Sequence, residues 1–259
     1  GVNGSKIVEV NVRGEVFSEN VVDAPEHGKN LKLSIDSRLQ GKMYESIETL
    51  AGEIGYLGGA GLVVDIASGE LLVATSFPEY DSETLSTGSD RESINAFIAD
   101  PNKPFLNRAV GGLYPSGSTV KPFIALGALN ENIINANTTV YSSGEIRVPN
   151  PYNKELFTVF RDWKKGGHGT TDVTKAIAES VNTFFYAIGG GYEGQAGLGI
   201  SRIEKYIKLF EIGDKTGVDI LGEVSGVVPG PEWKKKVFDG DAWRLGDTYN
   251  TSIGQYGFQ

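Results

Sequence analysis

Two short apolar runs joined by a tight turn are the strongest constraint that this sequence places on its fold. Residues 61–66 and 70–75 are rich in Leu, Val and Ile, and they flank Ala67-Ser68-Gly69. This pattern predicts a β-hairpin of two well-buried strands. Residues 1–30 also alternate between polar and apolar side chains around a turn at Gly14, which predicts further short strands before the hairpin.

Helical spacing dominates much of the remaining chain. Asp36 is a good N-cap for a first helix, and helices are predicted over residues 121–129, 172–179 and 183–188. A capping box at Ser201–Glu204 opens a last helix. The predicted packing faces are Leu39, Met43, Ile47, Leu50 and Ile54 in the first helix and Ile203, Ile207 and Phe210 in the last. Loop-like or irregular structure is expected over residues 78–104, over residues 138–158 and in the tail from Gly213.

Composition removes several classes of function. The 259 residues include no cysteine and two histidines, His27 and His168, so thiol catalysis, disulfides and cysteine-ligated zinc are excluded and no metal site is predicted. A net charge of −9 argues against a broad surface for nucleic acid. The longest apolar run, Phe123–Leu129, is far shorter than the ~18 residues that a membrane-spanning helix requires.

The sharpest local signal is Ser118-Thr119-Val120-Lys121, which follows a Pro/Gly turn and opens an apolar helix. Side chains three residues apart lie on one face of a helix. The positive end of the helix dipole lowers the pKa of a nearby lysine and favours a developing alkoxide. A neutral Lys121 could then accept the proton of Ser118, which is nucleophilic catalysis without histidine. The spacing alone arises by chance about once in such a chain, so an ordinary buried helix start is the alternative.

A second candidate is Ser180-Val181-Asn182, at the junction of two predicted helices. A hydroxyl and a carboxamide two residues apart cannot share a helix face, but a turn can direct both into one cleft. The same spacing occurs at Ser18–Asn20 and Ser93–Asn95, so it is weak by itself. Apolar helices on both sides distinguish Ser180.

Other motifs favour structural interpretations. His168 could join a serine and Asp162 as a triad or bind a metal, but a histidine between glycines is more often structural. Residues 112–118 have the glycine spacing of a phosphate-binding loop, with Ser118 where the lysine is needed. Residues 189–194 fit a dinucleotide motif but end a helix, which predicts a flexible loop. Lys234-Lys235-Lys236 is interpreted as a solvated charge run, with contact to an anionic polymer as the alternative.

Many segments occur in the order that one known family shows. Besides the two serine motifs they are Glu9–Asn11 with Gly14, Leu31–Asp36 with Leu39-Gln40, Ala60–Asp65 with Ser68–Glu70, Ser76–Asp81, Asn107–Ala109, Asp162-Trp163 with Gly167–Gly169, Thr216–Asp219 with Gly222-Glu223, and Ser252–Gln255. In this number and order they resemble the penicillin-binding serine transpeptidases, in particular the class B enzymes of the cell-elongation type. The resemblance covers essentially the whole chain.

The resemblance implies an α+β fold of the penicillin-binding-protein transpeptidase and serine β-lactamase type, an antiparallel sheet flanked by helices. It implies the end of a pedestal or dimerisation domain at residues 1–30 and the front part of the transpeptidase domain at 31–259. Lys215-Thr216-Gly217 matches the family's third motif in letters, but its surroundings match a different family segment. We therefore expect a chain truncated before its third motif and last strands, poorly stable and inactive in isolation, with a membrane anchor upstream.

For the site, the resemblance implies that Ser118 attacks the carbonyl between the two terminal D-alanines of a peptidoglycan stem peptide, with Lys121 as the base. Ser180 would relay a proton toward the leaving group, Asn182 would bind the substrate amide, and the Ser118 N–H would be one oxyanion-hole donor. No cofactor is implied. Expected partners are stem peptides, β-lactams, which would acylate the same serine, and membrane-embedded elongation proteins, all at the extracytoplasmic face of the bacterial membrane.

Two alternatives remain open within this resemblance. One is a hydrolase, either a D,D-carboxypeptidase or a β-lactamase, although no Glu-x-x-Leu-Asn segment for a deacylating base lies between Ser118 and Lys215. The other is a non-catalytic β-lactam sensor that is acylated without turnover. The lifetime of the acyl-enzyme, with and without an amine acceptor, distinguishes the three.

Overall fold

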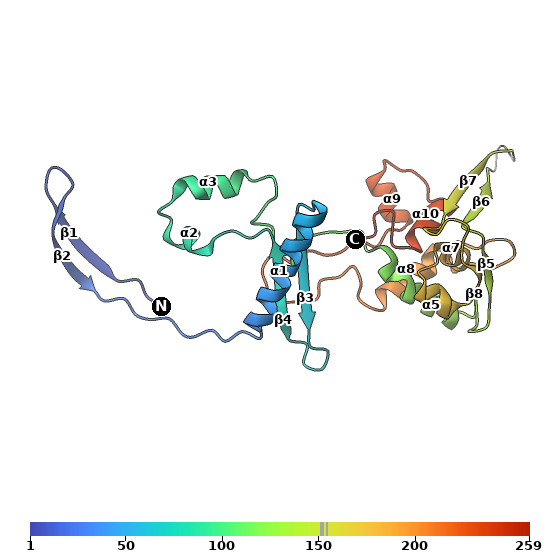
Figure 1. Ribbon diagram of the computed structural model, residues 1–259, viewed down its shortest axis with the longest axis horizontal. Helices are drawn as coiled ribbons and strands as arrows, with labels where there is room; N and C mark the ends of the chain where they lie inside the picture. The colour runs from blue at the N-terminus through green and yellow to red at the C-terminus, as the bar shows by residue number, and fades with distance from the viewer. Residues whose placement is uncertain (151–152, 154) are drawn as a thin grey trace. The chain divides into compact units, whose positions relative to one another are not determined.

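The computed structural model describes residues 1–150, 153 and 155–259, which divide into two compact units, Gly1–Pro78 (unit 1) and Glu79–Gln259 (unit 2) (Figure 1). The described strands form antiparallel pairs, and helices occur in both units. This mixture agrees with the α+β class. Among the described residues, no helix combines the length and the apolar character that crossing a membrane requires.

The N-terminal hairpin of unit 1 pairs β1 (Ser5–Val10) with β2 (Val16–Asp23), as the alternation predicts. Asn11 shapes the turn, because its side-chain oxygen accepts from the backbone N–H groups of Arg13 and Glu15. Most side chains of both strands are exposed, apolar ones included. The hairpin is therefore held by its backbone ladder rather than by a core of its own.

Helix α1 (Ser37–Ile54) packs along the hairpin of β3 (Gly59–Val64) and β4 (Leu71–Phe77), as Figure 1 shows. The predicted N-cap is confirmed: the Asp36 carboxylate accepts from two backbone N–H groups of the first turn. These hydrogen bonds hold the pKa of Asp36 below its usual value.

The burial of this layer is narrower than predicted. Met43 and Ile47 contact β3, whereas three residues of the predicted face are exposed: Leu39 (48%), Leu50 (51%) and Ile54 (58%). The sequence also predicted that both strands of the hairpin are well buried. This is wrong for β3, where Leu62 and Val64 are exposed, and it holds for β4 at Val73. A two-stranded hairpin is narrower than the apolar stripe of an 18-residue helix, so it covers only part of that stripe.

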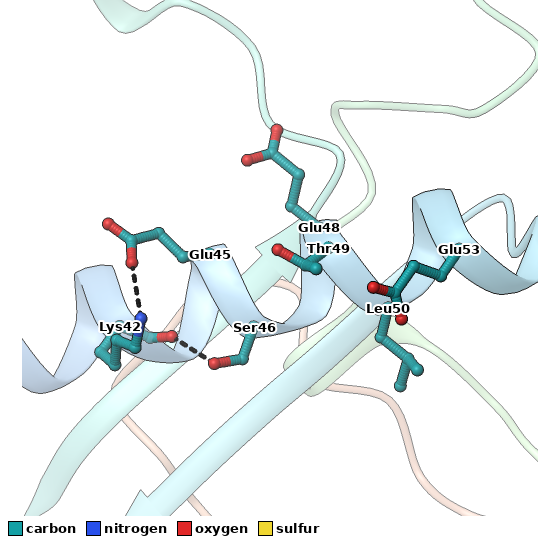
Figure 2. Close-up of a pocket in the computed structure, with 7 residues that line it drawn as sticks. All are labelled: Lys42, Glu45, Ser46, Glu48, Thr49, Leu50 and Glu53. Atoms are coloured by element: carbon teal, nitrogen blue, oxygen red, sulfur yellow. Dashed lines mark hydrogen bonds and ion pairs between the residues drawn. The ribbon is translucent and has the colours of Figure 1, made fainter.

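A shallow hollow on the exposed side of α1 is shown in Figure 2. Its lining comes from one helix and consists of Lys42, Glu45, Ser46, Glu48, Thr49, Leu50 and Glu53. Lys42 pairs with Glu45 at 3.1 Å, and the Ser46 hydroxyl donates to the Lys42 carbonyl. These are the side chains and contacts of an ordinary solvated helix face, so we assign the hollow no function.

Unit 2 begins with helices that the sequence interpretation missed. The region 78–104 contains α2 (Ser82–Thr87) and α3 (Arg91–Ala99), and α4 (Arg108–Gly111) follows. The irregular structure predicted there is wrong. Asp81 and Asp90 cap α2 and α3 through their carboxylates. Those caps are visible in the sequence, but the polar composition of the region hides the short helices that follow them.

The core of unit 2 gathers around α7 (Asn182–Gly190), which contacts α5 (Lys121–Asn130), α8 (Ile200–Lys208) and α10 (Leu245–Thr251). A side chain at Gly189 would collide with Ser252, and one at Gly190 would collide with the Tyr249 ring. α10 packs directly on these glycines, so the flexible loop predicted for residues 189–194 is wrong for residues 189 and 190, which form the end of α7. Residues 191–194 lie outside the helix.

The segment predicted to be turn-rich contains short strands. β5 (Val140–Ser142) pairs with β8 (Gly169–Thr171), and β6 (Glu145–Pro149) pairs with β7 (Phe157–Arg161). Residues 151, 152 and 154 of the predicted segment lie outside the described residues. The strands are three to five residues long, too short for a clear alternating pattern in the sequence.

The two helices that flank the Ser180 segment are confirmed, and the next helix along the chain differs from the prediction in its start and its buried face. α6 (Val173–Ala178) and α7 lie where predicted. The capping box is wrong, because α8 begins at Ile200 with Gly199 as its N-cap and without a side-chain cap. Ile203 and Ile207 are fully buried, whereas Phe210 follows the helix end and is 45% exposed.

The tail also differs from the loop expected from Gly213 on. It contains α9 (Pro231–Val237) and α10, and it buries one residue of the predicted solvated charge run. Lys234 is 3% exposed, and its Nζ lies 2.7 Å from Asp247 and 3.0 Å from Asp241. Burial alone would lower the pKa of Lys234, but the hydrogen bonds to the two carboxylates outweigh it and raise the pKa above its usual value.

This buried ion pair predicts a large difference between neighbouring lysines. Lys234→Ala should lower the free energy of unfolding by about 3–5 kcal/mol, because it leaves the buried carboxylate of Asp247 without its cation. Lys236→Ala, at an exposed position of the same helix, should change it by less than about 0.5 kcal/mol. Urea denaturation of the full-length protein measures both, and equal effects would show that Lys234 is as dispensable as a surface lysine.

Candidate active site

Ser118 lies in a short 3-10 helix, η1 (Gly117–Val120), that runs directly into α5. Residues three apart eclipse one another in a 3-10 helix, a geometry compatible with the predicted common face of Ser118 and Lys121. Ser118 is exposed and Lys121 is 2% exposed. The segment thus presents a hydroxyl to solvent and buries an amine three residues later. Within the described part of the chain, the Ser118 hydroxyl makes no hydrogen bond.

The Lys121 amine brings two of the other predicted site residues together. Its Nζ donates to the Ser180 carbonyl at 2.8 Å, to the Ser180 Oγ at 3.0 Å and to the Asn182 Oδ1 at 2.6 Å. It also lies 5.3 Å from the centre of the Phe185 ring. The three oxygen partners match the three N–H donors of an ammonium group. The two serine motifs therefore meet at one nitrogen.

Burial governs the electrostatics of this amine. It lowers the pKa of Lys121 to about 8, and the charge of Asp162 acts in the opposite direction. The sequence argument relied on the helix dipole, whereas the structure identifies desolvation as the main cause. An amine with a pKa of about 8 has a substantial neutral fraction near neutral pH, which an exposed lysine lacks.

The Ser180 turn is the C-terminal cap of α6. The Val181 N–H donates to the Ala176 carbonyl at 2.9 Å and the Ser180 N–H to the Ile177 carbonyl at 3.3 Å, which is the Schellman pattern. Such a cap needs a left-handed residue, and Ser180 has φ 52°. Val181 is fully buried. Val181 thus anchors the turn in the core, and the side chains of Ser180 and Asn182 on either side of it both contact Lys121.

His168 has the structural setting that the sequence favoured. Its Nδ1 lies 2.7 Å from Glu179 and its Nε2 lies 3.3 Å from Asp162, so within the described part of the chain both ring nitrogens contact carboxylates rather than a serine hydroxyl. Asp162 also accepts from the backbone N–H and the hydroxyl of Thr183. No group of three or more His, Cys, Asp or Glu side chains among the described residues is arranged to hold a metal ion.

A segment that includes Gly254 and Phe258 is hydrogen-bonded to the two residues that precede Ser118. The Gly117 N–H donates to the Gly254 carbonyl at 2.9 Å, and the Ser116 N–H donates to the Phe258 carbonyl at 3.4 Å. Gly254 has φ 71°, and a side chain there would collide with the Gly117 carbonyl. Sequence reasoning matched Ser252–Gln255 to the family but did not place it beside Ser118.

Lys215-Thr216-Gly217 lies outside any helix or strand. The Thr216 backbone N–H and hydroxyl both donate to Glu223 at 2.6 Å, and the Gly217 N–H donates to the same carboxylate at 3.2 Å. These bonds hold the pKa of Glu223 below its usual value. The sequence predicts a loop here rather than an edge strand, and the structure confirms that local prediction.

Comparison with known proteins agrees with the motif order. The profile of the penicillin binding protein transpeptidase domain matches residues 59–257. The peptidoglycan D,D-transpeptidase MrdA of Escherichia coli strain K12 is 38% identical over 256 residues, which are 98% of this chain and 37% of that protein. The MrdA of Haemophilus influenzae is 37% identical over 255 residues, 98% of this chain and 36% of that protein.

Solved structures show the same likeness. PBP2 from Helicobacter pylori in its complex with MreC matches with a TM-score of 0.75 and 37% identity over 98% of this chain and 44% of that chain. This chain spans little more than a third of the length of the curated relatives. Since the domain profile covers most of its residues, the chain belongs to the penicillin-binding protein transpeptidase family, in the class B, elongation-type branch that its motifs predicted.

Proposed function

We propose that the protein is a serine-type peptidoglycan D,D-transpeptidase that uses Ser118 as its nucleophile. One observation carries the proposal: an amine with a lowered pKa, buried three residues after an exposed serine, donates to both polar residues of the Ser180 turn. Membership in the transpeptidase family and relatives named as D,D-transpeptidases support the reaction class. These names also favour transfer to an amine over simple hydrolysis.

In the proposed acylation, the Ser118 oxygen attacks the carbonyl carbon between the two terminal D-alanines of a stem peptide. The hydroxyl proton passes to Lys121, and the Ser118 N–H, at the start of a helix, donates to the oxygen that gains negative charge. The C–N bond then breaks, the terminal D-alanine leaves with a proton on its amine, and an ester joins the peptide to Ser118. Attack by the amine of a second stem peptide forms the cross-link and releases the serine.

The contacts of Lys121 suggest how the proton reaches the leaving group. A neutral amine keeps two N–H donors and one lone pair, which must face a donor. Among its three oxygen partners, the Ser180 carbonyl and the Asn182 side-chain oxygen only accept, whereas the Ser180 hydroxyl can also donate. The onward transfer of the proton from Lys121 to the leaving group can therefore go through the Ser180 hydroxyl, which supports its role as the relay. Asn182 keeps its N–H donors for the substrate amide.

Location and partners follow from the proposed substrate. Peptidoglycan is assembled outside the cytoplasmic membrane, so we place the reaction on its extracytoplasmic face. The structural relative from Helicobacter pylori was solved in complex with MreC, and another relative belongs to a peptidoglycan synthase complex. By analogy, we infer that this protein works with membrane-embedded elongation proteins and that β-lactams acylate it at Ser118.

Removing the nucleophile should abolish covalent labelling. Ser118→Ala in the full-length protein should show no stoichiometric adduct with a fluorescent penicillin, because it removes the hydroxyl oxygen that would form the ester. Ser116→Ala, two residues earlier, is the control and should label normally. If Ser118→Ala is still labelled, and mass spectrometry maps the adduct to another residue, Ser118 is not the nucleophile.

The lowered pKa of Lys121 predicts the pH dependence of acylation. The base is active when neutral, so the second-order rate constant for a penicillin should rise about tenfold per pH unit below pH 8 and level off above it. Lys121→Ala should lower the constant by about 10²–10⁴-fold and remove this midpoint. Stopped-flow fluorescence between pH 6 and 10 measures both, and a rate that keeps rising through pH 10 would contradict a buried lysine base.

A further inference from the structure

A second polar cluster lies behind the Ser180 turn, and the proposed mechanism does not use it. Its centre is His168, whose side chain is 1% exposed. This ring lies between the fully buried side chain of Asp162 and the side chain of Glu179, which is 42% exposed. Both ring nitrogens of His168 lie within hydrogen-bonding distance of a carboxylate oxygen. Polar groups this deeply buried are costly unless they are paired, so the arrangement of the cluster is narrowly defined.

The cluster holds the Ser180 turn at both ends. Glu179 directly precedes Ser180 and binds His168 through its side chain. Thr183 directly follows Asn182, and its backbone N–H and hydroxyl donate to Asp162 at 2.9 and 3.0 Å. The three turn residues thus lie between two anchors that meet at one imidazole ring.

Two further contacts tie the same cluster to the turn. The Trp163 indole N–H lies 3.2 Å from the carbonyls of both Glu179 and Ser180. The Ser142 hydroxyl accepts from the Thr183 hydroxyl at 2.7 Å and from the His168 backbone N–H at 3.2 Å. The Ser180 carbonyl that accepts from Trp163 also accepts from Lys121. A displacement of the cluster would therefore reach the amine through this shared oxygen and through the two side-chain oxygens of the turn.

Ser180 needs such support. It is a non-glycine residue at φ 52°, in a conformation that persists when surrounding contacts define it. The Schellman bonds fix the path of the backbone, but they leave the orientation of the two polar side chains to other contacts. The bonds of Glu179, Trp163 and Thr183 supply these contacts on both sides of the residue.

We propose that the Asp162–His168–Glu179 cluster positions the Ser180–Asn182 turn on Lys121, and that Glu179 is a positioning residue for acylation. The proposal rests on the function proposed above. Among the described residues, no member of the cluster is hydrogen-bonded to Ser118 or Lys121. Asp162 acts on Lys121 by its charge, whereas Glu179 acts through the turn. Glu179 is the member to test, because it is half-exposed and its removal opens no buried cavity.

The test compares Glu179→Ala and Glu179→Gln with the wild type in the full-length protein. Acylation by a fluorescent penicillin is measured over a range of concentrations, which separates the rate constant at saturation from the half-saturating concentration. We expect Glu179→Ala to lower the saturating rate constant by about 10–100-fold, as misplaced catalytic groups do. Glu179→Gln should recover most of the rate, because its amide oxygen still accepts from the His168 ring.

Asp241→Ala is the matched control. Asp241 is 39% exposed and is one of two carboxylates on a buried cation, Lys234, just as Glu179 is one of two on His168. Its loss should lower the melting temperature but leave the saturating rate constant of the folded protein unchanged. Trp163→Phe, which removes the indole N–H and keeps a ring, is the second test variant. It should lower the same constant, and it replaces Glu179→Ala if that variant does not fold.

The outcomes separate the two proposals. If the wild type is not labelled at Ser118, the proposed function fails. If the wild type is labelled but folded Glu179→Ala, or Trp163→Phe in its place, reacts within twofold of it, the function stands and the positioning role is overturned. Equal rate losses in Glu179→Ala and Asp241→Ala would also overturn it, because the effect would then be general destabilisation.

Discussion

The site depends on one buried nitrogen and the three oxygens around it. The Lys121 Nζ ties the start of α5 to the Ser180 turn, and these segments are about 60 residues apart in the chain. Burial lowers the pKa of Lys121, while Asp162 and the oxygen partners keep the charged form tolerable. An amine held at this balance can give up its proton and recover it, which a fully exposed or fully paired lysine does poorly.

Lys234 shows the contrast within the same unit. Both lysines are nearly inaccessible to solvent, but Lys234 faces two carboxylates and its pKa is raised, whereas Lys121 faces uncharged oxygens and its pKa is lowered. Equal burial therefore yields a structural cation in one case and a candidate base in the other. The charge of the neighbours, rather than burial alone, decides between the two roles.

The sequence predicted the parts of the site that are local. Ser118 and Lys121 share one helical start, and the Ser180 turn follows from a predicted helix end. Local spacing marked each as a candidate, and the motif order of the family selected them. The bonds that join His168 to Glu179 and Thr183 to Asp162 were not predictable, because they span irregular strands too short to show a period. The prediction that Lys234 is solvated was wrong for a similar reason. A run of three lysines in the sequence is typical of a solvated surface, and only the folded tail brings Asp241 and Asp247 to Lys234.

A crystal structure of the full-length protein after reaction with benzylpenicillin tests the central claim most directly. The account predicts an ester between the opened β-lactam and the Ser118 oxygen, with the Lys121 amine still within hydrogen-bonding distance of the Ser180 hydroxyl and the Asn182 side chain. Attachment at another residue, or a Lys121 side chain turned out to solvent with the Ser180 turn displaced, would contradict it.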